Sequence, residues 1–188
     1  MRGPVVRGII FTAAKAVAII AFASCAMPLP DMLAMKEPNI VIRKSARTLE
    51  VHDGSTLVRK FGIVLGRSPE GDKQIEGDGR TPEGEFYIFT KNAKSRFHLS
   101  LGISYPAGED AERGLAGGLI SDEEHRAILA AIGDKAMPPQ KTQLGGEIYI
   151  HGGGTAEDWT DGCVALANDE MSELFEAIPV GTRVTILE

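Results

Sequence analysis

The sequence contains few cysteines, few aromatic residues and no excess of basic charge. Only two of its 188 residues are cysteines, Cys25 and Cys163, which excludes a disulfide framework and a zinc site built from several thiolates. Aromatic residues make up 6% of the chain, and the formal net charge is −6. Nucleic-acid binding normally requires a clustered basic face, so the charge argues against nucleic acid as a partner.

Three common site motifs are also absent. The four histidines show no paired spacing, and Cys163 is the one cysteine outside the amino-terminal segment of residues 1–25, so no metal site is predicted. Gly77-Asp-Gly79 is not followed by Gly-Lys-Ser/Thr, which excludes a phosphate loop of that type. No Gly-x-Ser-x-Gly pentapeptide occurs, so His151-Gly-Gly-Gly is not the oxyanion loop of a lipase.

The longest apolar run, residues 16–23, is too short for a comfortable transmembrane helix, which needs roughly 20 apolar residues. Basic residues precede this run and small residues end it. That order predicts a secretory signal over residues 1–25, followed by a proline-marked linker over residues 26–38. We therefore expect one exported domain over residues 39–188, located in the periplasm or cell envelope.

The end of the predicted signal leaves two alternatives open. Ala23-Ser24-Cys25 resembles the end of a bacterial lipoprotein box, in which the cysteine is lipidated and anchors the protein to a membrane. Phe22 stands where that box usually has Leu, Val or Ile, and ordinary cleavage after Ala23 or Ala26 is the alternative. The mature domain retains Cys163, with Cys25 only at its extreme start where cleavage leaves it there. A lone thiol within an exported domain is a candidate reactive group.

Short segments rich in β-branched and aromatic residues predict a mostly-β domain of the β-rich α+β class. The predicted strands cover residues 39–43, 48–52, 56–58, 60–65, 85–89, 97–101, 147–150 and 182–187. Asp53-Gly54 predicts a hairpin turn. Ser121-Asp-Glu-Glu124 is a capping box that predicts a helix through about Ile132, and Asn168 is expected to cap a second helix.

The segment from His151 to Cys163 carries the strongest chemical signal. It brings one imidazole and one thiol within twelve residues, each beside glycine. A cysteine thiol has a pKa near 8.5, so it needs a nearby base to attack a carbonyl at neutral pH. The amides of Gly162 and Cys163 are expected to face the oxyanion that such an attack forms. An inert buried thiol with an unrelated loop histidine is the alternative.

The order strand, His-Gly, loop, Thr-x-Gly-Cys and helix resembles the L,D-transpeptidase catalytic domain family (YkuD-like). The matching residues are His151-Gly152 and 160–164, together with the Thr-Pro-x-Gly stretch in 77–87. Segments 97–106 and 163–171 are similar to the YafK-type branch in particular. The resemblance extends over roughly residues 39–188 and implies a single β-sandwich or barrel domain with two or more flanking helices.

The resemblance also implies a mechanism on peptidoglycan stem peptides that needs no cofactor. Cys163 corresponds to the nucleophile, which forms a thioester with the acyl group of diaminopimelate, and His151 to the general base. The Gly152 carbonyl corresponds to the group that orients the imidazole, Gly162 to an oxyanion donor and Thr160 to a support of the loop. An amine of another peptide, of an envelope protein or of a D-amino acid then takes the acyl group, or water does.

Two positions depart from the family pattern. Asp161 stands where many members carry histidine, and we expect its carboxylate to point away from the sulfur, because a nearby negative charge would raise the thiol pKa. Ala165 stands where many members carry arginine, which changes how a substrate carboxylate is held. Arg80 is a candidate substitute in the predicted substrate-binding set, although a solvated loop arginine is the favoured interpretation of this residue.

Other residues of the predicted substrate-binding set are Asp161 itself, Gly153 in the glycine loop and His98 on a strand expected to line the site. Trp159 is expected either to flank the cleft or to pack. Three functions therefore remain open: transpeptidation, hydrolysis of the same bonds by a carboxypeptidase or amidase, and a cell-wall-binding module without turnover.

Overall fold

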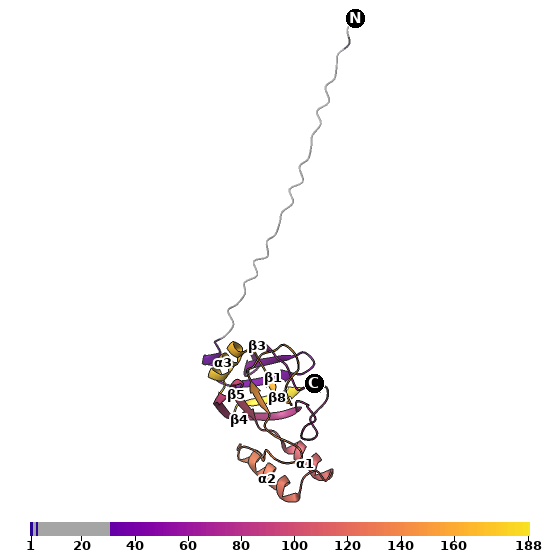
Figure 1. The fold of residues 1–188 in the computed structure, drawn as a ribbon. Helices are drawn as coiled ribbons and strands as arrows, with labels where there is room; N and C mark the ends of the chain where they lie inside the picture. The colour runs from indigo at the N-terminus through magenta and orange to yellow at the C-terminus, as the bar shows by residue number, and fades with distance from the viewer. Residues whose placement is uncertain (2, 4–30) are drawn as a thin grey trace.

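The computed structural model in Figure 1 describes residues 1, 3 and 31–188, so the predicted export signal and Cys25 lie outside the described part. A short 3-10 helix, η1 (Met32–Ala34), comes first. The strands are β1 (Pro38–Arg43), β2 (Thr48–Asp53), β3 (Thr56–Gly62), β4 (Gly84–Ser95), β5 (His98–Ile103), β6 (Tyr149–His151), β7 (Val164–Ala165) and β8 (Arg183–Leu187). The α-helices are α1 (Gly108–Ala116), α2 (Asp122–Gly133) and α3 (Asn168–Ala177).

Over residues 31–188 the eight strands form one curled sheet in the order β3-β2-β1-β8-β4-β5-β6-β7. The two ends of this order meet, because Val64, two residues after β3, pairs with Ala165 of β7. Each residue donates its N–H to the carbonyl of the other, at 3.0 and 2.9 Å. The predicted β-rich fold with flanking helices is confirmed, and the sheet closes two residues after Cys163.

The β2–β3 hairpin forms at Asp53-Gly54 as predicted, with Gly54 in the left-handed region at φ 59°. The separate strand predicted over 60–65 is wrong, since β3 continues to Gly62 and the chain then leaves the β2 edge. Leu65 shows the reason: its carbonyl accepts the N–H of Thr160 at 3.2 Å. The backbone partners of residues 63–65 lie in the turn between β1 and β2, in β7 and in the loop before Cys163, which local sequence does not reveal.

The capping box of α2 is confirmed. Ser121 Oγ accepts the N–H of Glu124 at 3.2 Å, and the Glu124 carboxylate accepts the Ser121 N–H at 2.8 Å. Asn168 does not cap α3, however, because that helix has Ala167 at its N-cap without a side-chain hydrogen bond. The Asn168 amide oxygen instead accepts the Gly153 N–H at 2.9 Å and fastens the glycine loop.

The sheet and α3 share the main core, in which Met171 and Leu174 are fully buried. The sequence analysis missed α1, whose nine residues include two glycines that lower helix propensity. In Figure 1, α1 and α2 lie together at one end of the sheet. They pack on a second apolar cluster formed by Ala111, Ile120, Ile128 and Leu144.

The chain between β5 and β6 carries these two helices and then returns to the sheet through residues 134–148. Met32, which belongs to the predicted linker 26–38, is buried in the main core with 3% of its surface exposed. In the part of the chain that the structure describes, no helix has the length and apolarity needed to cross a membrane.

Candidate active site

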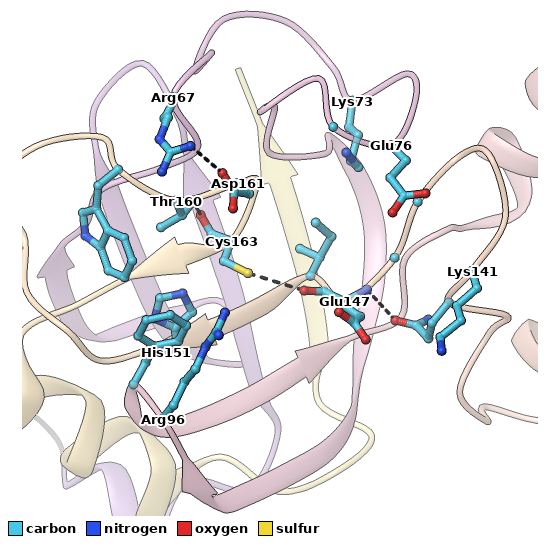
Figure 2. A pocket seen from close by; sticks show the side chains of 17 residues that line it. Arg67, Lys73, Glu76, Arg96, Lys141, Glu147, His151, Thr160, Asp161 and Cys163 are labelled. Carbon is cyan, nitrogen blue, oxygen red and sulfur yellow. Dashed lines mark hydrogen bonds and ion pairs between the residues drawn. The ribbon is translucent and has the colours of Figure 1, made fainter.

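Cys163 and His151 line the same cavity of about 750 Å³ (Figure 2). A second cavity of about 500 Å³ meets the first at these residues. The residues that line both cavities are Arg96, Phe97, Glu147, His151 and Cys163. The thiol and the imidazole therefore lie at a junction that a ligand can approach from two sides.

Parallel strand pairing brings the two groups together. His151 is the last residue of β6, and Cys163 directly precedes β7. Ile150 pairs with Val164, and His151 pairs with Ala165. The intervening glycine-rich loop carries the chain back so that β7 runs parallel to β6, and the two side chains are held at adjacent strands of one sheet.

The imidazole of His151 is fixed on two sides. Its Nδ1 lies 2.6 Å from the carbonyl oxygen of Gly152, a distance that places a proton on Nδ1 and leaves Nε2 as the acceptor. The Phe97 ring stacks on the imidazole with centroids 4.7 Å apart, and the edge of Trp159 meets it at 5.5 Å. Gly152 thus takes the orienting position predicted for it.

The pKa of His151 is lowered from its ordinary value. Burial is the main cause, since it disfavours the charged imidazolium. The Gly152 carbonyl acts in the opposite direction, and the positive charge of Arg96 lowers the pKa further. The imidazole is therefore neutral at pH 7 and able to accept a proton.

The thiol of Cys163 is bonded to backbone rather than to the imidazole. Its Sγ donates to the carbonyl oxygen of Glu147 at 3.4 Å and accepts the N–H of Tyr149 at 3.4 Å. Burial raises the pKa of Cys163 to about 11, with smaller increases from the charges of Asp161 and Glu147. At neutral pH the resting thiol is protonated.

Thr160 ties the loop before Cys163 to itself. Its hydroxyl donates to the Cys163 carbonyl at 2.7 Å and accepts the N–H of Gly162 at 3.2 Å. The predicted role of the Gly162 amide as an oxyanion donor needs correction, because this N–H is already engaged within the loop. Gly162 has a φ of +130°, and a Cβ there would stand 2.7 Å from the Arg80 carbonyl oxygen.

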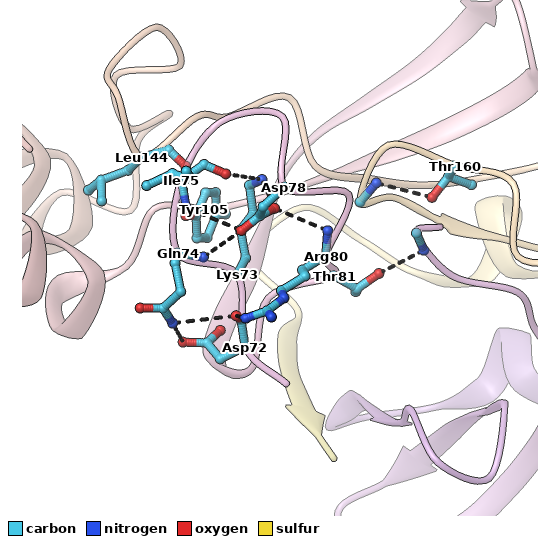
Figure 3. Close-up of polar contacts among 12 residues, drawn as sticks. Asp72, Lys73, Gln74, Ile75, Asp78, Arg80, Thr81, Tyr105, Leu144 and Thr160 are labelled. Carbon is cyan, nitrogen blue, oxygen red and sulfur yellow. Dashed lines mark hydrogen bonds and ion pairs between the residues drawn. The ribbon is translucent and has the colours of Figure 1, made fainter. Parts of the chain in front are cut away.

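The carboxylate of Asp161 pairs with Arg67 at 2.9 Å, and both side chains are exposed. The ion pair directs it away from the sulfur, although its charge still contributes to the raised pKa of Cys163. Arg80 does not line either cavity at the thiol. Its guanidinium donates to the Asp72 carbonyl at 3.3 Å (Figure 3), so the prediction that Arg80 holds substrate here is wrong.

The other two predicted substrate contacts also lie outside the junction. His98 Nε2 is 2.8 Å from the Ser172 hydroxyl on α3, so this side chain joins the hairpin to a helix. Gly153 packs under Trp159, where a Cβ would stand 3.1 Å from Cζ2, and lines a separate pocket of about 340 Å³. Trp159 therefore packs against the imidazole and also flanks the cavity.

The sequence analysis did not single out Arg96 or Glu147 as site residues. Arg96 lies in the two-residue turn between β4 and β5, where Ser95 pairs with His98. Glu147 has a left-handed φ of 56°, which no motif announces. Within residues 1, 3 and 31–188, no three acidic, histidine or cysteine side chains gather as a metal site.

The amino-acid sequence matches the model of a known protein family. Residues 37–186 match YkuD, the L,D-transpeptidase catalytic domain. The chain belongs to this family. Among curated relatives, the candidate L,D-transpeptidase YqjB of Bacillus subtilis (strain 168) is 25% identical over 166 residues, which cover 86% of this chain and 74% of YqjB. The resemblance predicted from the motifs is confirmed.

Solved structures share the fold. The helical cell shape determining protein Pgp2 of Campylobacter jejuni gives a TM-score of 0.53 at 21% identity, over 81% of this chain and 48% of that protein. Bd1075 of Bdellovibrio bacteriovorus gives 0.52 at 18% identity, over 82% of this chain and 49% of the other. The chain thus spans about half the length of these L,D-transpeptidase-fold structures.

Proposed function

We propose that this protein is an exported cysteine acyltransferase of the L,D-transpeptidase type that acts on peptidoglycan stem peptides. One observation carries the proposal: a neutral imidazole, fixed through Nδ1 by the Gly152 carbonyl, lies in the same cleft as Cys163. This combination supplies a nucleophile and a base with its orienting group, which together suffice for acyl transfer without a cofactor.

In the first half of the reaction, Cys163 Sγ attacks the carbonyl carbon of diaminopimelate while the thiol proton passes to His151 Nε2. The C–N bond to the terminal residue then breaks, and Nε2 returns the proton to the leaving amine. In the second half, an acceptor amine attacks the thioester and gives its proton to Nε2. The C–S bond breaks, and the sulfur takes the proton back.

The hydrogen bonds around the sulfur favour particular roles in these steps. The thiol must turn from the Glu147 carbonyl to His151 before attack, because the resting proton lies toward Glu147. Within residues 31–188 the hydrogen bonds of the loop engage the Gly162 N–H and not the Cys163 N–H, which supports the Cys163 amide as the oxyanion donor beside the sulfur. Thr160 holds that amide in place through the Cys163 carbonyl.

The second half of the reaction has three candidate acceptors: the amine of another stem peptide, an amine of an envelope protein and a D-amino acid. Water as the acceptor would make the enzyme a carboxypeptidase or amidase. The proposed site of action is the periplasmic face of the envelope, with the chain either lipidated at Cys25 or released by ordinary cleavage. Mass spectrometry of the mature amino terminus distinguishes these two forms.

The test is a product analysis with the purified protein and its Cys163→Ala variant. Both are incubated with a disaccharide tetrapeptide, with and without an amine acceptor, and the products are weighed. Cross-linked or exchanged species that require Cys163 establish transfer, whereas trimmed peptides alone establish hydrolysis. His125→Gln, which alters a histidine far from the cleft on α2, serves as the control and keeps full conversion. If no muropeptide changes in a Cys163-dependent way, the enzymatic proposal is wrong.

A further inference from the structure

Arg96 projects into the junction of the two cavities. It occupies the turn between β4 and β5, and Figure 2 shows its side chain rising beside His151 toward the space below the sulfur. Of the five residues that line both cavities, Arg96 is the one with a positive charge. Its guanidinium therefore faces any ligand that reaches Cys163 from either side.

Two other cations that line the first cavity already have partners. Arg67 pairs with Asp161 at 2.9 Å, and Lys73 pairs with Asp78 at 2.9 Å. Within the described range 31–188 the Arg96 side chain forms no ion pair and no hydrogen bond, and its guanidinium lies over the Phe97 ring, with Cζ 4.7 Å from the ring centroid. The planar donors of this guanidinium are thus available to a ligand.

The turn that carries Arg96 is held rigidly. Phe97 is stacked on His151 and meets Trp159 at 5.3 Å, while its N–H donates to Ser95 Oγ at 3.1 Å. His98 is joined to Ser172 on α3 at 2.8 Å. Because its neighbours on both sides are anchored, the guanidinium starts from a nearly fixed backbone, which lowers the entropic cost of binding.

An unpaired positive charge beside the base opposes catalysis until an anion neutralises it. Arg96 lowers the pKa of His151, and so it disfavours the imidazolium that forms when the thiol is deprotonated. An anionic group bound to Arg96 removes this penalty at the moment the substrate arrives. Ala165, which stands where many family members carry arginine, is fully buried and leaves that position without a cation.

We propose that Arg96 binds the terminal carboxylate of the peptide whose carbonyl Cys163 attacks, a proposal that rests on the proposed function. In a peptide that loses its last residue, this carboxylate lies one residue beyond the attacked carbonyl, within about 4 Å along the chain. Guanidinium and carboxylate are complementary in shape and pair through two parallel hydrogen bonds. Arg96 thereby selects chain ends over internal peptide bonds.

The test is binding of a stem tetrapeptide to full-length protein carrying Cys163→Ala, measured by calorimetry. Two peptides are compared, one with a free terminal carboxylate and one with a terminal carboxamide. Loss of the charged contact is expected to weaken binding of the free acid about 10- to 100-fold in Arg96→Gln, with a partial loss in Arg96→Lys. The amidated peptide is expected to bind both proteins equally weakly.

Lys141→Gln is the matched control, because it removes an exposed positive charge from the wall of the first cavity only. Equal losses in Lys141→Gln and Arg96→Gln, or equal losses for both peptides in Arg96→Gln, would overturn the proposal. The readout does not require turnover. Binding that depends on Arg96, without conversion that depends on Cys163, would therefore support this site and contradict the acyltransferase function. Conversion that depends on Cys163 but is unchanged in Arg96→Gln would support the acyltransferase function and contradict the role of Arg96.

Discussion

The thiol of Cys163 donates its hydrogen bond to the carbonyl oxygen of Glu147, 3.4 Å away, and forms none with His151. Glu147 presents this carbonyl from a left-handed backbone conformation, which the amide of Gln140 supports by accepting the Glu147 N–H at 2.7 Å. The resting thiol is thus neutral and is bonded to the segment of residues 134–148, which connects α2 with β6.

The raised pKa of Cys163, about 11, predicts slow alkylation of the folded protein. At pH 7.5 its thiolate fraction is roughly 300-fold below that of a free cysteine of pKa near 8.5. The iodoacetamide reaction rate, followed in a Cys25→Ser background, is expected to be lower by about that factor and to rise with pH beyond 9. A rate at pH 7.5 equal to that of free cysteine would contradict the assigned environment.

Replacement of Asp161 by Asn is expected to speed that alkylation about two- to threefold at low salt. The negative charge disfavours the thiolate, so its removal lowers the pKa of Cys163, and the exposure of the carboxylate keeps the effect small. Glu157→Gln, on the same loop, is the control and leaves the rate unchanged. A slower reaction in Asp161→Asn would show that the Arg67 pair positions the loop instead.

Thr160→Val is expected to lower kcat/KM about tenfold and the free energy of unfolding by about 1–3 kcal/mol. The substitution leaves the Gly162 N–H and the Cys163 carbonyl without their buried partner. Thr160→Ser keeps the hydroxyl and should retain most of the activity and stability. Wild-type behaviour of the valine variant would mean that these two bonds do not hold the nucleophile.

Asp158→Ala is expected to lower the free energy of unfolding by about 2 kcal/mol in urea titrations. Its carboxylate accepts the Leu65 N–H at 2.8 Å and pairs with Arg47 at 2.6 Å, so it fastens the loop before Cys163 to the chain after β3. Most of the loss is assigned to the backbone bond, because the ion pair is partly exposed. The neighbouring Glu157→Ala should stay within about 0.5 kcal/mol of the wild type.

Gly66→Ala and Gly62→Ala form a matched pair. A Cβ at Gly66 would stand 2.1 Å from the Gly79 carbonyl oxygen and 3.0 Å from the Gly162 nitrogen, so backbone must move. We expect a loss of about 3 kcal/mol in unfolding free energy and a sharp fall in activity. A Cβ at Gly62 meets nothing within 4 Å, and this variant should unfold like the wild type.

Much of the fold could be predicted because its signals are local. Asp53-Gly54 specifies a tight turn through the conformational freedom of glycine, and Ser121 with Glu124 closes a capping box within one helical turn. The predictions for 60–65 and for Asn168 were wrong for a shared reason. In both cases a group with a plausible local partner is bonded instead to the loop between His151 and Cys163.

The predicted site likewise contains residues that local sequence places correctly and residues that it does not. The His151, Gly152 and Cys163 positions follow from a motif that ends β6 and directly precedes its parallel neighbour β7, so a single loop of the chain brings them together. Arg80, the candidate named for the missing cation, does not line either cavity at the thiol. Its side chain turns to Asp72, and Arg96 projects into the cleft from a hairpin turn more than fifty residues before Cys163.

The sequence by itself determined the β-rich fold and the candidate thiol and imidazole, since residue patterns, turn chemistry and glycine spacing act over a few residues, and the resemblance of its motifs indicated the family. Only the tertiary structure decided where the thiol proton rests, which amide beside the sulfur is engaged and which arginine lines both cavities at Cys163. These properties depend on hydrogen bonds and charges between segments far apart in the chain. The segments that form these hydrogen bonds and charge contacts come together when the sheet closes between Val64 and Ala165.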